Sequence, residues 1–264
     1  IALLSPLYSS ILPQLVYILF MKLIKADNYQ TWYIEKNNES IIIDTWLTKK
    51  LNTNNSFFIQ RTKKTRTYLK QNQIEKIKAI IITAPFEDHL NIESIKYFSK
   101  DTPIYTSNMV SKILKKKFVS NPIHILSELG TKICHMNVSA LPTSYPYYSS
   151  TFSILFESNN KRIFHEGHIV NFKYLHKHQI KADVSILTAD QVKLFGLITL
   201  GMGTKNTLKA CKMLESENLF ITGNNPDDTK GFIGKFLLTK KMEIDKISSE
   251  INVYVNGGDA IEIN

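Results

Sequence analysis

Short apolar runs separated by polar turns make up most of the chain from Met21 onward, a pattern typical of a strand-rich domain. Strands are predicted in the first half at 21–26, 31–36, 40–44, 78–83 and 104–106. Apolar spacing predicts helices over 88–99 and from a cap at Ser107 through Phe118. Residues 48–70 are polar and basic without a clear period, so a loop leading into a helix is predicted there.

The second half repeats this order. Strands are predicted at 133–141, 151–157, 162–165, 183–188 and 219–222. A helix is predicted over 204–216, with Thr204 as its cap, and two strands flank the Asn256-Gly257-Gly258 turn within 251–263. No linker rich in Pro, Gly or Ser separates the halves, and 264 residues suffice for one large core. The expected architecture is a single sandwich of two sheets with helices outside.

Residues 1–20 differ from the rest because they carry no charge and are mostly apolar. The segment is long enough to span a bilayer, but Pro6 and Pro13 interrupt it, and it has neither a basic start nor a small-residue cleavage site. We therefore expect 1–20 to be a leader or upstream extension outside the fold, and 21–264 to form one domain. A membrane anchor is the alternative interpretation; without one, no membrane partner is expected.

The formal charge of +10 suits a polyanionic partner, but the lysines are spread along the chain and their short runs are typical of solvated faces. Nucleic acid is therefore not an expected partner, and an unidentified small-molecule substrate is. The two cysteines, Cys134 and Cys211, have no metal-finger spacing and lie in apolar surroundings. They are expected to be core residues, which fits a cytoplasmic location.

Candidate chemistry gathers where predicted strands end. The strand ending at Thr83 is followed by a loop that opens the next helix with Asp88 and His89. The strand at 40–44 ends in Asp44, and a later strand runs into Glu166-Gly167-His168. Carboxylates and imidazoles are the side chains that bind zinc and similar ions, and Asp88, His89 and His168 are the metal-ligand candidates among these residues.

This arrangement resembles the metallo-β-lactamase superfamily, which places His-x-His-x-Asp-His directly after such a strand. Ala84 and Phe86 stand at the first two histidines of that motif, while Asp88 and His89 match it. His168 stands where the family has a metal-bridging aspartate. The resemblance implies a four-layer αββα sandwich of the α/β (α+β) class and a metal-dependent hydrolase.

The resemblance is closest to an atypical branch found in cyanobacteria and plants. That branch also lacks the first histidines and carries a Glu-Pro-His element, of which Glu166-Gly167-His168 is the counterpart. Three histidines hold the first metal in the family. Here those positions hold Ala84, Phe86 and the hydroxyl side chains near Thr143-Ser144, so the first site is expected to be absent.

What remains of the second site is Asp88, His89 and His168. These residues are compatible with one divalent ion (zinc, manganese or iron) and equally with no metal. In the second case Asp88 caps the helix that follows it, His89 forms a local hydrogen bond, and His168 fills the vacated cavity.

The other candidates have different roles. Asp88 and Glu166 are the catalytic candidates, Asp44 is expected to orient loop backbone near the site, and Asp190 and Asn224 are candidate substrate contacts. His165 is predicted to point away from His168, at the surface or a sheet edge. Two main functions follow: a hydrolase with one metal and an activated water, or a catalytically inactive binding or scaffolding module. A nucleic-acid-processing relative, suggested by the positive charge, is the weakest interpretation, because the resemblance implies that processing nucleases of this fold rely on a complete metal pair.

Overall fold

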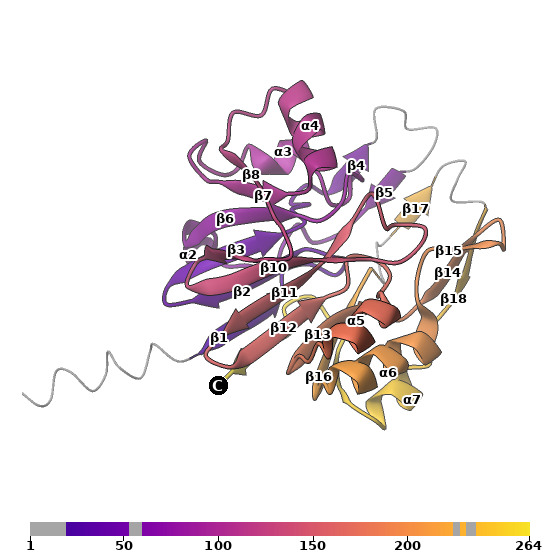
Figure 1. Ribbon diagram of the computed structural model, residues 1–264. Coiled ribbons are helices and arrows are strands. Elements are labelled where there is room, and N and C mark those ends of the chain that lie inside the picture. Colours follow the sequence, from indigo (N-terminus) through magenta and orange to yellow (C-terminus); the bar gives the residue numbers. More distant parts are fainter. Residues whose placement is uncertain (1–19, 53–59, 224–227, 231–235) are drawn as a thin grey trace, which may run out of the picture.

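The computed structural model describes residues 20–52, 60–223, 228–230 and 236–264 (Figure 1). Two seven-stranded sheets lie against each other within these ranges. The first sheet contains, in spatial order, β20 (Ala260–Ile263), β1 (Met21–Lys25), β2 (Trp32–Lys36), β3 (Glu39–Ile43), β6 (Ile77–Ile82), β7 (Ile104–Thr106) and β8 (Ile123–Ile125). The second contains β19 (Asn252–Tyr254), β16 (Asn218–Thr222), β13 (Val184–Thr188), β12 (Lys161–His165), β11 (Phe152–Ser158), β10 (Met136–Pro142) and β9 (Thr131–Ile133).

Three large apolar clusters show how the layers stack. Alternate residues of the strands, such as Trp32 and Ile34 of β2, enter the cluster between the two sheets. The intervening Tyr33 faces the opposite side of the first sheet, where a second cluster packs under helices. The helices over the first sheet are α2 (Gln71–Glu75), α3 (Ile92–Ile95) and α4 (Asn108–Lys116). Those over the second sheet are α5 (Phe172–His178), α6 (Gly203–Leu214) and α7 (Ile244–Ser248).

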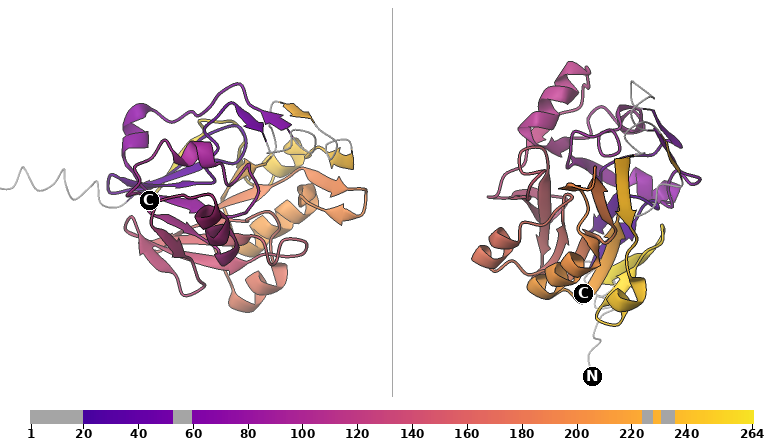
Figure 2. Two further views of the ribbon diagram at one scale, coloured as in Figure 1. Left: turned by 90° about the horizontal axis from the view of Figure 1, so that it is seen from above. Right: turned by 90° about the vertical axis from the view of Figure 1, so that its right-hand side faces the viewer.

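Helices therefore cover both outer faces of the paired sheets, as the two views of Figure 2 also show. The predicted αββα sandwich is confirmed. Each sheet has a parallel half: β3, β6, β7 and β8 in the first, and β12, β13, β16 and β19 in the second. The carboxyl ends of neighbouring parallel strands lie at the same edge of their sheet, which is where ligand sites form in such sheets.

The polar segment 48–70 is not the featureless loop that its sequence predicts. It contributes β4 (Lys50–Asn52) and β5 (Gln60–Thr62), which form a small antiparallel sheet with β17 (Asp228–Lys230). Each of these strands has only three residues and little apolar alternation, and β5 pairs both with the nearby β4 and with β17, more than 160 residues away in sequence. A second small sheet contains β15 (Ile198–Thr199), β14 (Gln191–Leu194) and β18 (Leu237–Lys240).

The predicted single strand at 133–141 is two strands. Cys134 and His135 both have positive φ, 46° and 63°, and form a two-residue turn between β9 and β10. Such turns normally use Asn or Gly, so the residue types at these two positions do not predict a turn. Cys134 is consequently half-buried in a turn, and Cys211 is buried in the core as expected.

The strands around Asn256-Gly257-Gly258 do not pair with each other. β19 joins β16 in the second sheet and β20 joins β1 in the first, so the turn carries the chain from one sheet to the other. Helix α6 begins one residue earlier than predicted, with Met202 rather than Thr204 at its N-cap. The predicted leader falls in residues 1–19, which lie outside the described residues, and β1 begins at Met21.

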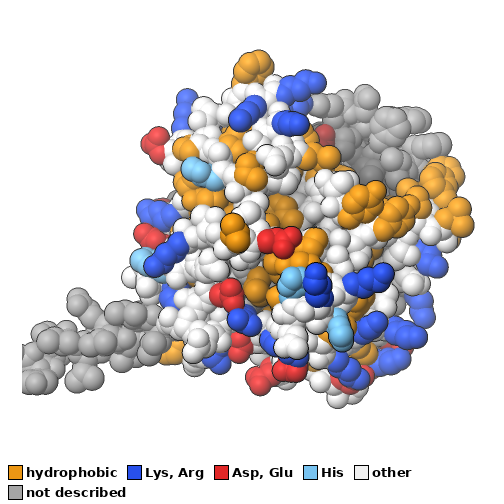
Figure 3. Space-filling model, in the orientation of Figure 1, with side chains coloured by type: hydrophobic (Ala, Val, Ile, Leu, Met, Phe, Trp, Pro, Cys, Tyr) orange, Lys and Arg blue, Asp and Glu red, His pale blue; other side chains and the backbone are white. Residues whose placement is uncertain are grey.

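In the part of the chain that the structure describes, no helix has the length and apolar character needed to cross a membrane. On the face shown in Figure 3, lysine and arginine side chains are scattered over the surface with acidic side chains among them. Apolar side chains are also visible towards the centre of that face.

Candidate functional site

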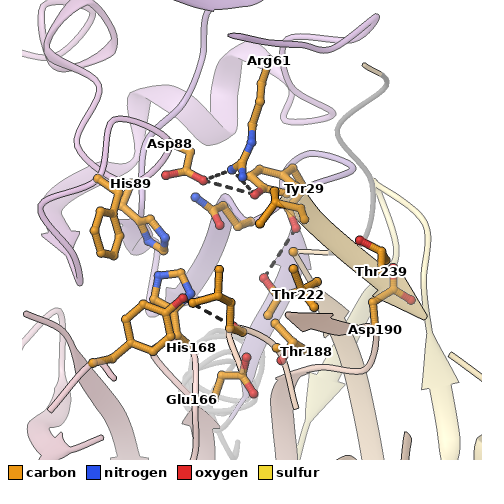
Figure 4. A pocket seen from close by; sticks show the side chains of 18 of the residues that line it. Tyr29, Arg61, Asp88, His89, Glu166, His168, Thr188, Asp190, Thr222 and Thr239 are labelled. Carbon is orange, nitrogen blue, oxygen red and sulfur yellow. Dashed lines mark hydrogen bonds and ion pairs between the residues drawn. The ribbon is translucent and has the colours of Figure 1, made fainter. Parts of the chain in front are cut away.

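A cavity of about 750 Å³ lies at the carboxyl edges of the two sheets. Its lining comes from segments that are far apart in sequence (Figure 4). They supply Tyr29 after β1, Arg61 in β5, Asp88 and His89 after β6, and Glu166 and His168 after β12. The structure thus brings together the three residues predicted to hold a metal, with Glu166 in the same cavity.

His89 is oriented by Asp44, the residue that follows β3. Nδ1 of His89 lies 2.8 Å from Oδ2 of Asp44. The same carboxylate accepts hydrogen bonds from the backbone nitrogen of Thr83 at 2.8 Å and from its hydroxyl at 2.7 Å. Burial alone would raise the pKa of Asp44, but the neighbouring His89 outweighs it and the pKa lies below its ordinary value. Asp44 is therefore a charged acceptor, and the Nδ1–H group of His89 donates to it.

This hydrogen bond leaves the second ring nitrogen of His89, Nε2, for the cavity. Nε2 has no hydrogen-bond partner among the described residues. Burial lowers the pKa of His89, but Asp44 raises it more, and the net shift is upward.

Asp88 does not cap a helix, although a cap was predicted for it in the case that the site binds no metal. Helix α3 begins only at Ile92, and its cap is Asn91, whose side chain accepts a hydrogen bond of 2.9 Å from the backbone nitrogen of Ser94. Oδ2 of Asp88 instead contacts Nη1 of Arg61 and accepts a 3.1 Å hydrogen bond from the hydroxyl of Tyr29. Burial would raise the pKa of Asp88, but the Arg61 guanidinium, the two neighbouring imidazoles and the Tyr29 hydrogen bond together outweigh it and lower the pKa to about 2.

Arg61 and Tyr29 are site residues that the sequence did not reveal. The Arg61 guanidinium also contacts the Tyr29 hydroxyl and lies 5.1 Å from the centre of the Tyr29 ring. No motif marks either residue, because Arg61 sits in the polar segment interpreted as a loop. The only available signal was a cationic residue in a segment that precedes the Asp-His pair.

A strained turn places His168. Gly167 and His168 have φ values of 59° and 100°, and a positive φ is unusual for a bulky side chain such as imidazole. A Cβ at Gly167 would lie 2.0 Å from the carbonyl oxygen of Phe152, so only glycine fits. The turn stacks the His168 ring on Tyr147, with centroids 4.4 Å apart, and brings it to 4.6 Å from the His89 ring.

The prediction that His165 lies at the surface is wrong. His165 is buried and lines the same cavity as His168. The prediction extended strand alternation past the end of β12, but β12 ends at His165 and the positive φ values that follow turn the chain back towards the cavity.

Burial sets the charges on this side of the cavity. It lowers the pKa of His168 to about 3 and that of His165 to about 4, so both rings are neutral near pH 7. It raises the pKa of Glu166 to about 8, an effect that Thr188 offsets only in part. Nε2 of both histidines and both carboxyl oxygens of Glu166 lack hydrogen-bond partners among the described residues. Buried polar atoms without partners are rare in native proteins and indicate a ligand-binding site.

The positions of the family's first metal carry no nitrogen donor. Ala84 is buried, and the Phe86 ring lies 5.6 Å from the His168 ring and 6.2 Å from the His89 ring, centroid to centroid. Phe86 is 39% exposed, so it forms part of the cavity rim rather than a sealed core. The hydroxyl of Thr143 pairs with Thr151.

The donors available to a metal are the Nε2 atoms of His89 and His168 and the carboxylate of Asp88. Within the described ranges, no group of three or more His, Cys, Asp or Glu side chains is arranged to hold a metal ion. Oδ2 of Asp88 already faces a cation, the guanidinium of Arg61. Two imidazoles and a carboxylate are donor types that a divalent ion such as zinc takes.

Of the two candidate substrate contacts, Asp190 lines the cavity. Its carboxylate accepts hydrogen bonds of 2.9 Å from Nζ of Lys241 and from the backbone nitrogen of Met242, so it also anchors the segment after β18. Asn224 lies outside the described residues. Substrate contact stays a prediction for both.

Several solved structures are similar to this chain in architecture. A protein described as a possible metal-dependent hydrolase from Veillonella parvula has 16% identity and a TM-score of 0.70, covering 92% of this chain and 99% of its own. An isothiocyanate hydrolase from Delia radicum gut bacteria has 17% identity and a TM-score of 0.69, with coverage of 91% and 98%. The metallo-β-lactamase-fold protein YhfI from Bacillus subtilis has 12% identity and a TM-score of 0.63, with coverage of 92% and 99%.

At these identities the similarity shows the fold alone. The fold is that of the metallo-β-lactamase-fold proteins. A search of curated proteins found no match. Residues 39–222, more than half of the chain, match the family model described as the beta-lactamase superfamily domain. The chain belongs to this family. The matched range contains Asp44, Asp88, His89, Glu166 and His168.

Proposed function

We propose that the protein is a metal-dependent hydrolase with at most one metal ion, held by His89, His168 and Asp88. The observation that carries the proposal is the pair of buried imidazole Nε2 atoms that lack partners and whose rings lie 4.6 Å apart, beside an ionised carboxylate. A second ion has no ligands at Ala84, Phe86 or Thr143. The descriptions of the similar structures as hydrolases support the same class of reaction.

The parts of the site have different tasks in this proposal. His89, His168 and Asp88 would hold a divalent ion, which would supply an acidified water and polarise the substrate. Asp44 fixes the tautomer of His89, so that Nδ1 carries the proton and Nε2 presents its lone pair, an arrangement common in metal sites. Glu166, whose pKa is raised to about 8, holds a proton at neutral pH and is the proposed donor to the leaving group.

The cavity also indicates what kind of substrate fits. Its volume of about 750 Å³ is in the range of small-molecule sites. Leu51, Val192, Leu200 and Leu237 line it together with the polar groups. A small molecule with an apolar portion and one hydrolysable bond is the proposed substrate.

The second candidate is a catalytically inactive binding module. The contact between Arg61 and Asp88 favours it, because a cation already neutralises the carboxylate. In this case the same cavity binds a small molecule without turnover. The two candidates differ in metal content, which decides between them.

The test is elemental analysis of the purified protein, followed by titration with zinc and manganese. Wild type is expected to bind one ion per chain and His168→Ala none. His178→Ala, which removes an exposed imidazole on α5, is the matched control and should bind like wild type. Hydrolysis is then measured with an aryl isothiocyanate and a nitrophenyl ester. Absence of metal from wild type at neutral pH would favour the binding module.

A further inference from the structure

We infer that Arg61 competes with the metal ion for Asp88, so that the guanidinium controls how tightly the site binds metal. This inference rests on the proposed function, because it concerns the affinity of that same site. Its starting point is the contact of Nη1 of Arg61 with Oδ2 of Asp88, which is the oxygen that also accepts the Tyr29 hydroxyl.

Arg61 is built into this position. Nη1 contacts both Asp88 and the Tyr29 hydroxyl, and the guanidinium lies over the Tyr29 ring at 5.1 Å. The side chain of Arg61 is only 17% exposed and that of Asp88 only 11%. Nε of Arg61 has no hydrogen-bond partner in the described part of the chain, and Nη1 contacts Asp88 and Tyr29.

Two cations cannot share this carboxylate without mutual repulsion. A divalent ion bound to Asp88 and to the nearby imidazoles would lie within a few ångströms of the guanidinium, where screening by water is weak. An arginine cannot relieve the repulsion by losing its proton, because the guanidinium stays protonated in proteins. The Arg61 contact with Asp88 therefore weakens metal binding through this carboxylate.

The topology separates the two sides of this competition. Asp88, His89 and His168 follow strands β6 and β12 of the main sandwich, whereas Arg61 lies in β5 of the small three-stranded sheet. Withdrawal of Arg61 therefore leaves the ligand-bearing loops in place. Tyr29 can keep its hydrogen bond to Asp88 after Arg61 leaves.

The experiment is a double-mutant cycle on zinc affinity, measured against a chelating dye, with the visible spectrum of cobalt as a second readout. Arg61→Met is expected to bind zinc at least about tenfold more tightly than wild type, since Asp88 becomes a full ligand. Asp88→Asn in the Arg61→Met background should remove that gain, but should change wild-type affinity much less. Arg162→Met, which removes a surface guanidinium paired with Glu157, is the control and should bind like wild type.

Two further variants protect the test against misfolding. Arg61→Gln should repeat the gain, and Arg61→Lys, which keeps a cation, should not. Equal or weaker zinc binding by folded Arg61→Met and Arg61→Gln would overturn the inference while leaving the proposed function intact. If wild type and all Arg61 variants bind no metal, the proposed function fails and the inference fails with it.

Discussion

Nδ1 of His89 lies 2.8 Å from Oδ2 of Asp44, and neither residue is exposed to more than a few per cent. Asp44 comes from the first sheet after β3, and His89 from the loop after β6. The carboxylate also fixes Thr83 through both its backbone nitrogen and its hydroxyl. One carboxylate thus links a strand end, the start of the Asp88 loop and the orientation of a candidate metal ligand.

Replacing Asp44 with Asn tests this link. Asp44→Asn is expected to lower the free energy of unfolding by about 1–3 kcal/mol, because buried hydrogen bonds to a charged acceptor are lost. Urea unfolding monitored by circular dichroism measures the change. Asp101→Asn, at an exposed turn, is the matched control and should stay within about 0.5 kcal/mol of wild type. An equal effect of both substitutions would contradict the structural role of Asp44.

Restoring the family's first two histidines is not expected to restore the first metal site. The Ala84→His/Phe86→His variant still lacks a third nitrogen, because the Thr143 hydroxyl is paired with Thr151 and Ser144 donates to the carbonyl of Val170. Ala84 is fully buried, so a larger side chain there should also cost about 1–3 kcal/mol of stability.

Elemental analysis of that variant checks the expectation. At most one metal ion per chain should be found, and Ala84→His alone should account for most of the lost stability. Two ions per chain would show that the missing third histidine is not what prevents the first site from forming.

The sheets were predictable because their strands alternate between two apolar environments. Trp32 and Ile34 of β2 enter one cluster and Tyr33 the other, a period that is visible in the sequence. The positions of Asp88, His89 and His168 at strand ends were predictable for the same reason. The predicted strand boundaries locate these three residues, and the resemblance to the metallo-β-lactamase motif is what suggests metal binding.

Arg61 was not predictable, because its position depends on a pairing between β5 and β17 across more than 160 residues and on no local pattern. The prediction for His165 was wrong because the alternation of side chains holds only inside the strand. The positive φ values of Gly167 and His168, which turn the chain after the strand, cannot be predicted from the residue types alone. Cys134 and His135 adopt a turn that their residue types do not favour. The failures therefore lie where backbone conformation, rather than polarity, decides the structure.

Lys25 provides a prediction of how stability depends on pH. Its ammonium group is buried and donates to the carbonyl oxygens of Ile221 at 2.6 Å and Val255 at 2.7 Å. Burial lowers the pKa of Lys25 from 10.5 to about 8, although Asp27 and Asp259 act in the opposite direction. The folded protein therefore binds fewer protons at Lys25 than the unfolded chain does between these two pH values.

Stability contributed by Lys25 should accordingly rise as the pH increases from about 8 towards 10.5, and be lost as the pH falls through 8. The comparison is wild type with Lys25→Met, whose difference cancels the titration of all other groups. The free energy of unfolding of wild type minus that of Lys25→Met should increase by about 1 kcal/mol between pH 8 and 9, since one pKa unit corresponds to 1.36 kcal/mol. A constant or shrinking difference would contradict the lowered pKa of Lys25.

Gly167 gives the sharpest test of how the candidate site is built, because Gly196 offers a matched comparison. Both have positive φ, 59° and 71°, so a Cβ strains the backbone at either position. At Gly196 the Cβ would meet only Leu238 at 3.6 Å, an ordinary contact, whereas at Gly167 it would lie 2.0 Å from the carbonyl oxygen of Phe152. Gly196→Ala is therefore expected to cost about 1 kcal/mol, and Gly167→Ala about 3 kcal/mol or more, in urea unfolding. The turn that carries His168 must shift in the second variant, so its zinc affinity should also fall while that of Gly196→Ala is kept. Equal losses of stability in the two variants would mean that the turn after β12 has room that the structure does not show.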